Sequence, residues 1–426
     1  MTEPRELSLR ARAAHLTVAA AVIAAVPLGA QPPRVMFVTS STGSGNFSSW
    51  SEAGGQTGLA AADKVCRARA TAAGLANAST FVAWASDSSD DAYCRVTGFA
   101  GTKETNCGQG SLPDGGPWVR TDGRPFARSL ADLTAANRLL YPATRGESGQ
   151  VVTGWIWDAT RESGVLLKSG NTPIDCLEWT SGSSGDFGGE GVTGNGTGWW
   201  SYFNTTNCSD PNHLLCFEPG TGGALAPFAE PGALAFVTSV DNVGNLHDWP
   251  QAGGASGLAA GDAICANLAT AAGLPFPSLF RAWLSTAAVA AKDRLTIDGP
   301  WKRRDGVEIA ATKTQLTSAL TPADYALTAP LDVSETGSYR ASPTEAWTGT
   351  RFDGTSAVSH CASWTDGTAG SNGFGGRFLD SRGAWSEGTQ WTCDATLPLY
   401  CLANIVTLFW DGFESSDLGA WSTHSP

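Results

Sequence analysis

Apolar residues fall in short runs along most of the chain, separated by Gly, Ser, Asn and Asp. Runs of this length between turn residues are typical of short strands. Two longer Ala-rich segments, residues 59–74 and 258–273, end in Gly as capped helices do. The clearest predicted strands cover residues 35–40, 81–84 and 213–217 in the first half and 234–239 and 399–402 in the second. The pattern predicts an α+β protein with long irregular loops.

The two halves of the chain repeat one another. Residues 37–75 and 236–274 are identical at 22 of 39 positions, at an offset of 199. The register then shifts, and Trp118 aligns with Trp301 at an offset of 183. At an offset of 185, the aligned residues are Cys176, Trp179, Trp200, Cys208 and Cys216 with Cys361, Trp364, Trp385, Cys393 and Cys401. Three cysteines and two tryptophans in one register predict two copies of one fold.

The repeat sets the predicted domain boundaries. The first copy is expected at residues 35–218 and the second at 234–403. Residues 219–233 between them are rich in Pro, Gly and Ala, which indicates a linker. Residues 404–426 form a C-terminal tail, for which a sorting or anchoring role and a plain frayed terminus are both open.

The N-terminus predicts export. Three arginines precede an apolar run of about thirteen residues at 16–28, and small residues follow it. This arrangement is typical of a secretory signal peptide, expected here at residues 1–30, although an amphipathic N-terminal helix is the alternative. An exported chain keeps its cysteines oxidised, so disulfides and a secreted or cell-surface location are expected.

Composition narrows the possible partners. The 426 residues include 42% apolar but only 16% charged residues, and the net charge is −13. No cluster of Lys and Arg occurs, so a groove that follows a nucleic-acid backbone is not expected. After the N-terminal run, no apolar stretch reaches about 18 residues, so no transmembrane helix is predicted.

Ten cysteines give the strongest chemical signal. Each copy holds four at matching positions: Cys66, Cys176, Cys208 and Cys216, and Cys265, Cys361, Cys393 and Cys401. The remaining two, Cys94 and Cys107, lie in a segment that the second copy lacks, so we expect them to be bonded to each other. Metal binding is the alternative, but no pair has the short spacing of zinc ligands.

The positions of the shared cysteines and of the residues around them resemble those of a known domain family. Residues 58–84, together with Cys176, Trp179 and the closing Cys208 and Cys216, resemble the endostatin domain, which has a C-type lectin-like fold. Both copies match, and they also resemble a bacterial family of extracellular domains of unknown function in that superfamily. The resemblance implies nested disulfides, with the pairs Cys66–Cys216, Cys176–Cys208, Cys265–Cys401 and Cys361–Cys393.

Several properties of endostatin and of lectins do not carry over. The chain is acidic, so the basic heparin-binding face of endostatin has no counterpart, and neither has its N-terminal zinc-binding His cluster. The EPN, QPD and Trp-Asn-Asp motifs of calcium-dependent lectins are also missing. No cofactor is therefore expected, although Asp87, Asp90 and Asp91 form an acidic cluster that could hold calcium. A solvated, charged loop is the alternative for that cluster.

Candidate binding residues come from two features. Exposed Trp can stack on sugar rings or anchor a protein partner, which singles out Trp199, Trp200 and Trp385, with core packing as the alternative. The resemblance places a binding surface in the Gly-rich loop 181–198, which contains Asp186 and Glu190. A flexible surface loop is the alternative for that segment.

No catalytic motif occurs, because the chain has no G-x-S-x-G, no H-E-x-x-H and no cysteine expected to be free. We therefore expect an exported, non-catalytic protein that recognises a carbohydrate or protein ligand. A hydrolase that acts on extracellular glycans through unmarked carboxylates is one alternative. A structural surface protein without a defined ligand is the other.

Overall fold

The computed structural model describes residues 31–226 and 231–407. The predicted signal peptide (1–30), part of the predicted linker (227–230) and most of the predicted tail (408–426) lie outside the described residues. The described residues form a mixed α+β structure with several sheets, as the sequence predicts.

Repeat 1, the copy predicted at residues 35–218, opens with a strand, a long helix and a second short strand, and repeat 2 is the copy predicted at 234–403. Its helices are α1 (Gly58–Ala72), α2 (Ala92–Thr97), α3 (Leu130–Thr134) and α4 (Cys176–Trp179). Its strands are β1 (Arg34–Val38), β2 (Val82–Ala83), β3 (Trp118–Arg120), β4 (Pro125–Ala127), β5 (Trp155–Trp157), β6 (Lys168–Ser169), β7 (Thr172–Pro173), β8 (Phe187–Val192), β9 (Asn204–Asn207) and β10 (His213–Phe217).

Repeat 2 follows the same order, except that a 3-10 helix, η7 (Ala291–Arg294), stands in the place of α2 and that no strands corresponding to β6 and β7 are found among the described residues. Its helices are α5 (Gly257–Ala271), α6 (Lys313–Leu316) and α7 (Cys361–Trp364). Its strands are β11 (Ala233–Val237), β12 (Phe280–Ala282), β13 (Trp301–Lys302), β14 (Glu308–Ala310), β15 (Glu345–Trp347), β16 (Asn372–Arg377), β17 (Gln390–Thr392) and β18 (Tyr400–Ala403).

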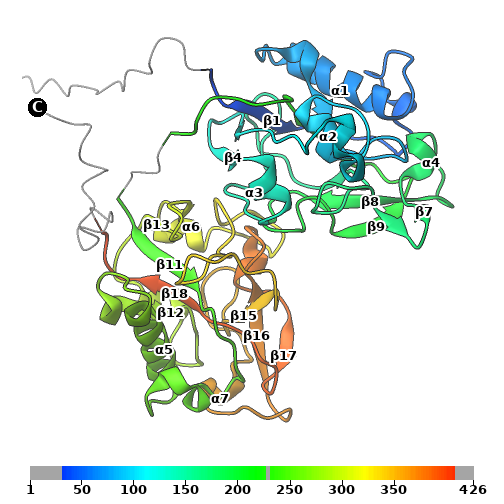
Figure 1. Ribbon diagram of the computed structural model, residues 1–426. Coiled ribbons are helices and arrows are strands. Elements are labelled where there is room, and N and C mark those ends of the chain that lie inside the picture. Colours follow the sequence, from blue (N-terminus) through cyan, green and yellow to red (C-terminus); the bar gives the residue numbers. More distant parts are fainter. Residues whose placement is uncertain (1–30, 227–230, 408–426) are drawn as a thin grey trace, which may run out of the picture. The chain divides into compact units, whose positions relative to one another are not determined.

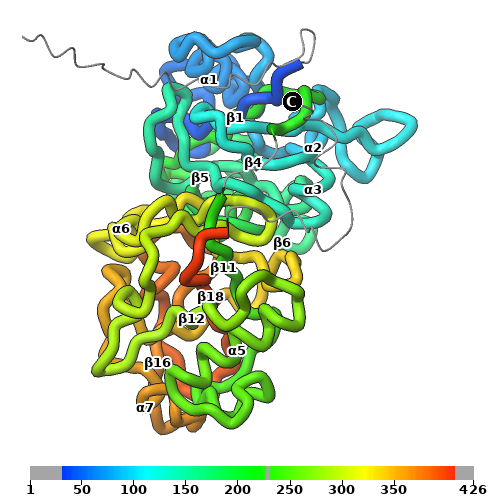
Figure 2. Tube along the Cα trace, turned by 90° about the vertical axis from the view of Figure 1, so that its left-hand side faces the viewer, coloured from blue at the N-terminus to red at the C-terminus, as the bar shows by residue number. Residues whose placement is uncertain are grey.

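The first and last strands of each repeat pair with each other. In repeat 1, β1 lies between β10, which is antiparallel to it, and β3, which is parallel to it. In repeat 2, β11 is likewise antiparallel to β18 and parallel to β13. Figure 2 shows β11, β18 and β12 side by side. A second set of strands, β5–β8–β9 in repeat 1 and β15–β16–β17 in repeat 2, is antiparallel throughout. Figure 1 shows β8 and β9 close to α4.

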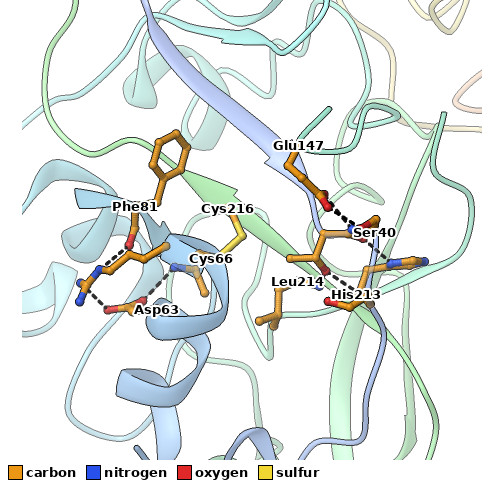
Figure 3. Close-up of a disulfide and its surroundings, with 12 residues drawn as sticks. Ser40, Asp63, Cys66, Phe81, Glu147, His213, Leu214 and Cys216 are labelled. Atoms are coloured by element: carbon orange, nitrogen blue, oxygen red, sulfur yellow. Dashed lines mark hydrogen bonds and ion pairs between the residues drawn. A yellow bond between two sulfur atoms is a disulfide. The ribbon is translucent and has the colours of Figure 1, made fainter. Parts of the chain in front are cut away.

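Helix α1 is tied to the last strand by a disulfide and to β2 by a carboxylate. Cys66 on α1 is bonded to Cys216 on β10 (Figure 3). The carboxylate of Asp63, one turn earlier, accepts the backbone N–H of Ala83 at 2.9 Å. Repeat 2 uses Asp262 for the same bond to its strand β12, at 3.0 Å. The Ala-rich helix therefore keeps its place through bonds that both copies share.

All ten cysteines are paired, and the predicted pairing is confirmed. The five disulfides are Cys66–Cys216, Cys94–Cys107, Cys176–Cys208, Cys265–Cys401 and Cys361–Cys393. The outer bond of each repeat closes a long segment, of 150 residues in repeat 1 and 136 in repeat 2. Closing loops of this length restricts the unfolded chain strongly.

The Cys-x-x-Trp motif forms a left-handed turn. All four residues of α4 have φ between 54° and 59°, and the four residues of α7 do the same between 49° and 70°. This conformation is costly for residues with a Cβ, so the surroundings must hold it in place. The disulfide holds one end, and at the other the indole N–H of Trp179 donates to the carbonyl of Ser86 at 2.8 Å.

Equivalent segments of the two repeats meet within one compact unit. Asn195 forms an antiparallel bridge with Asp380, which is its own equivalent at an offset of 185. The amide of Gly196 donates to the carbonyl of Leu379 at 2.7 Å. The equivalent amide, that of Ser381, donates at 3.1 Å to the equivalent carbonyl of repeat 1. Each bond maps onto the other when the repeats are exchanged, so the contact follows a local pseudo-twofold.

Candidate functional site

The strongest candidate surface lies on the sheet β5–β8–β9 of repeat 1. Trp155 is paired with Val192, and Glu190 is paired with Asn204. Because paired residues of a sheet point to the same face and i, i+2 neighbours share it, these side chains lie together on one face. We call Trp155, Glu190, Asn204 and Asn212 the Trp155 surface.

An indole dominates this surface. Trp155 is 38% exposed, although it lies in the middle of a sheet between β10 and β8. The ring of Phe203 contacts it, with centroids 5.3 Å apart, and the ring of Trp199 contacts Phe203 in turn, at 5.0 Å. These neighbours hold the Trp155 ring in place while leaving part of it open to solvent. A fixed and accessible indole offers a large apolar contact area at a low entropic cost.

A buried carboxyl group lies beside the indole. Glu190 is only 4% exposed, and its Oε2 accepts a hydrogen bond of 2.7 Å from Nδ2 of Asn212. The backbone of Asn212 is itself fixed by a pair of hydrogen bonds with Gly43, each of 3.0 Å. Burial raises the pKa of Glu190, against the lowering effect of the amide. The surface therefore combines the partly exposed ring and the exposed amide of Asn204, a group that binds hydroxyls, with a buried carboxyl–amide pair, in which Asn212 is 2% exposed.

A second buried carboxyl group, that of Asp158, faces the other side of the sheet. Its Oδ2 lies 2.9 Å from where a Cβ of Gly191 would point, whereas the adjacent Glu190 points the opposite way. Burial raises the pKa of Asp158 well above its usual range, and its Oδ2 has no hydrogen-bond partner in the part of the chain that the structure describes. Asp158 and Glu190 therefore do not flank a common substrate position as a glycosidase pair does.

Repeat 2 carries the same kinds of group at different positions. Glu345 on β15 occupies the position of Trp155, and Trp391 on β17 that of Thr206. The indole N–H of Trp391 donates to Oε2 of Glu345 at 2.8 Å, and Arg377 forms an ion pair with the other oxygen at 3.4 Å. The Trp391 ring is 39% exposed. Its only polar group and the carboxylate are thus already bonded to one another.

The structure corrects two of the predicted binding residues. Trp200 is 1% exposed and Trp385 is fully buried, so neither ring can contact a ligand. They are equivalent core residues, each with its ring centroid 5.0 Å from that of another buried tryptophan. Trp199 is half-buried and packs against the core cluster of repeat 2. It supports Phe203 rather than standing free in solvent.

The two acidic residues predicted in the Gly-rich loop 181–198 have different surroundings. Glu190 belongs to the Trp155 surface, while Asp186 accepts a hydrogen bond from the hydroxyl of Ser181. Repeat 2 makes the same bond with the two residues exchanged, because Asp366 accepts it from Ser371. The shared bond gives Asp186 a structural role in the turn before β8. The later part of the loop is taken up by the contact with repeat 2.

The acidic cluster predicted as a calcium candidate does not converge on one point. Asp87 accepts the backbone N–H groups of Ser89 and Asp90 at 2.9 and 2.8 Å. Asp91 is 4% exposed, and its two oxygens accept backbone N–H groups of Lys103 and Leu166, both at 2.8 Å. These carboxylates close turns. Within residues 31–226 and 231–407, no group of three or more His, Cys, Asp or Glu could hold a metal ion.

Sequence reasoning did not single out Trp155, Asn204, Asn212 or Glu345. The signal that could have found Trp155 is its alignment with a glutamate of repeat 2, since a core tryptophan would be kept in both copies. That alignment is hard to see in the sequence, because the offset between the repeats is 190 only around β5 and β15.

No protein-family model matches the chain, and no curated protein matches it. Among the residues that the structure describes, no helix is both long and apolar enough to cross a membrane.

Proposed function

We propose that this protein is an exported, non-catalytic binding protein and that the Trp155 surface recognises a carbohydrate. The observation that carries this proposal is the partly exposed Trp155 ring beside Glu190 and Asn212. Sugar rings present apolar C–H faces to an indole and hydroxyls to carboxyl and amide groups. The five disulfides support an extracellular location.

The proposal includes a C-type lectin-like fold for each repeat. Support comes from the disulfides of each repeat, whose outer bond joins the first helix to the last strand while the inner bond closes 32 residues. The adjacent first and last strands of each repeat support it as well. The hydrolase alternative receives less support, because Asp158 and Glu190, whose pKa values are both raised, face opposite sides of a sheet.

Affinity electrophoresis of the secreted protein tests the function. The protein would be run through gels containing soluble polysaccharides of different composition, including neutral and uronic-acid polymers. We expect retardation by at least one polymer for the wild type and loss of that retardation for Trp155→Ala. Trp391→Ala is the matched control, since it removes a ring of equal exposure from repeat 2 and should leave retardation unchanged.

Two results would count against the proposal. Retardation that survives Trp155→Ala would show that the polysaccharide binds at another surface. Equal mobility of the wild type in all the gels, together with release of reducing ends from one of the polymers, would favour an enzyme instead.

A further inference from the structure

A cavity of about 390 Å³ lies where the two repeats meet. Its polar lining comes from both repeats and includes Arg120, Arg124, Arg145, Glu308, Gln315 and Tyr325. Three guanidinium groups gather here in a chain whose net charge is −13. The volume is within the range of small-molecule sites.

Under the pseudo-twofold, this cavity corresponds to the surroundings of Arg303, which side chains fill. Arg303 is the equivalent of Arg120 at an offset of 183, and both side chains are buried. Nη1 of Arg303 donates to the Asp332 carboxylate at 2.6 Å, and the centre of its guanidinium lies 5.2 Å from the ring centroid of Tyr339. Nη2 also donates to the carbonyl of Leu139 in repeat 1, at 3.2 Å. This buried arginine thus has a carboxylate, a ring and the other repeat around it.

Arg120 keeps the carboxylate of Asp122 and lies 5.6 Å from the ring centroid of Tyr141, but it lacks the equivalents of Asp332 and Tyr339. Thr144 stands at the position of Asp332, and its hydroxyl accepts a hydrogen bond of 3.0 Å from Nη1 of Arg120. Val151, which is 56% exposed, stands at the position of Tyr339, and the two residues share the same bridge in their repeats. A neutral hydroxyl has replaced a carboxylate, and a small side chain has replaced a phenol ring.

The positive charge around the cavity has increased at the same time. Arg124 and Arg145 occupy the positions of Val307 and Val333, which are fully buried apolar residues. Nη2 of Arg124 lies 3.4 Å from Glu308, a long contact, and its Nη1 is buried without a hydrogen-bond partner among the described residues. A buried donor left unpaired is costly, so a ligand oxygen there would be stabilising.

We propose that this cavity binds a small ring-bearing carboxylate. Its carboxylate would take the place that Asp332 holds on Arg303, and its ring the place of Tyr339. Arg120 and Arg145 already share the carboxylate of Asp122, and Glu308 faces Arg124. These five groups leave one positive charge, which suits a ligand with a single negative charge.

Isothermal titration calorimetry on the full secreted chain tests this proposal. The probes are 4-hydroxybenzoate and D-glucuronate, which present a carboxylate on an aromatic ring and on a sugar ring. Their neutral controls are 4-hydroxybenzamide and D-glucose. We expect one of the two acids to bind at least tenfold more tightly than its neutral control. The acid that binds more tightly shows whether the ligand carries an aromatic ring or a sugar ring.

Variants that copy repeat 2 make the test specific. The double substitution Thr144→Asp with Val151→Tyr supplies the missing carboxylate and ring from within, so binding of the acid should be lost. The same variant should unfold at a higher temperature than the wild type, because Arg120 gains an internal partner. Arg124→Gln should weaken binding at least tenfold. Arg138→Gln and Val358→Tyr are the controls, at a 56% exposed arginine and a 92% exposed valine that do not line the cavity.

Two outcomes would overturn the proposal. One is that neither acid binds more tightly than its neutral control. The other is that the acid binds the double variant as well as it binds the wild type, which would place it outside the cavity. Neither outcome depends on Trp155, so the result does not depend on the proposed carbohydrate surface.

Discussion

The strand faces β5–β8–β9 and β15–β16–β17 show how two copies of one fold come to present different side chains. Each carries one partly exposed indole and one buried carboxyl group, but these come from β5 and β8 in repeat 1 and from β17 and β15 in repeat 2. In repeat 2, the indole N–H of Trp391 is bonded to Glu345. In repeat 1, Glu190 is bonded to Asn212 instead, and no hydrogen bond of the Trp155 indole is found within the described residues. The exposed indole of repeat 2 therefore has an internal partner for its N–H, whereas that of repeat 1 has none among the described residues.

The junction between the repeats shows the same kind of difference in internal partners. Arg303 bonds two carboxylates of its own repeat, those of Asp305 and Asp332, whereas Arg120 bonds only that of Asp122 and lines a cavity. The two copies therefore share a frame and differ in the internal partners of single side chains. The frame itself, made of disulfides and the helix–strand bonds of Asp63 and Asp262, is the same in both copies.

The largest effect should come from the shared frame. Replacing both Cys66 and Cys216 by Ala opens a link that closes 150 residues, and we expect a loss on the order of 5 kcal/mol in the free energy of unfolding. Replacing Cys94 and Cys107, which repeat 2 lacks, opens a link over only 13 residues and should cost about 3 kcal/mol. Urea unfolding followed by Trp fluorescence measures both. A larger loss for the short link would mean that repeat 1 depends on its insertion rather than on the shared frame.

The binding surfaces should differ next most. Removing the exposed ring with Trp155→Ala should weaken polysaccharide binding by roughly 30-fold, about 2 kcal/mol, as for an aromatic hot spot. Trp391→Ala should change the dissociation constant by less than about twofold, because its polar group already has an internal partner. Quantitative affinity electrophoresis over a range of polymer concentrations gives both values. Similar losses for the two variants would contradict the difference between the copies.

Asp158 should make the stability of repeat 1 depend on pH. Burial raises the pKa of Asp158 well above its usual range, so the folded state favours the protonated form. Its contribution is complete below the unfolded pKa of about 4 and is lost as the pH rises through the folded pKa. In repeat 2 the equivalent Thr348 donates a hydrogen bond of 2.7 Å to the carbonyl of Ser386. Asp158→Thr should therefore stabilise the protein by about 1–3 kcal/mol at pH 7, and the gain should shrink toward pH 4.

Thermal unfolding of the wild type and of Asp158→Thr between pH 4 and pH 8 measures this effect. Thr348→Ser, which keeps the hydroxyl, is the control, and the difference between its stability and that of the wild type should not change with pH. A gain that is the same at every pH would show that Asp158 is not held protonated.

The smallest effect should come from exchanging the turn of one repeat for that of the other. The double substitution Ser181→Asp with Asp186→Ser copies the Asp366 and Ser371 pair of repeat 2 into repeat 1. Because the same bond can form in the reverse direction, we expect a change within about 0.5 kcal/mol in the free energy of unfolding. Asp186→Ala, which removes the bond, should destabilise more than the exchange does.

The sequence predicted the frame well because repetition constrains it. The helices α1 and α5 lie close to the predicted Ala-rich segments, and all five disulfides are confirmed, including Cys94–Cys107. The strand expected at 81–84 is shorter, because only Val82 and Ala83 pair with β10. The repeat singled out Cys94 and Cys107 as a separate pair, whereas the nested pairing of the other eight cysteines was implied by the resemblance to the endostatin domain.

The binding residues could not be predicted in the same way. Whether a tryptophan is exposed depends on which neighbours cover it, and Trp199, Trp200 and Trp385 are all covered to some degree. The cavity depends on Thr144 and Val151, whose equivalents in repeat 2 lie at an offset of 188. That offset differs from those of the conserved motifs, so the lost carboxylate and ring became visible only when the strands were aligned in space.

The most direct test of the account follows the two exposed indoles in one sample. The wild-type protein, labelled with ¹⁵N at its tryptophans, would be titrated with a short oligosaccharide of the polymer that retards it, with indole N–H signals assigned from Trp155→Phe and Trp391→Phe. We predict that the Trp155 signal shifts on binding and that the Trp391 signal stays in place. A shift of Trp391 with an unchanged Trp155 would contradict the claim that repeat 1 holds the open surface.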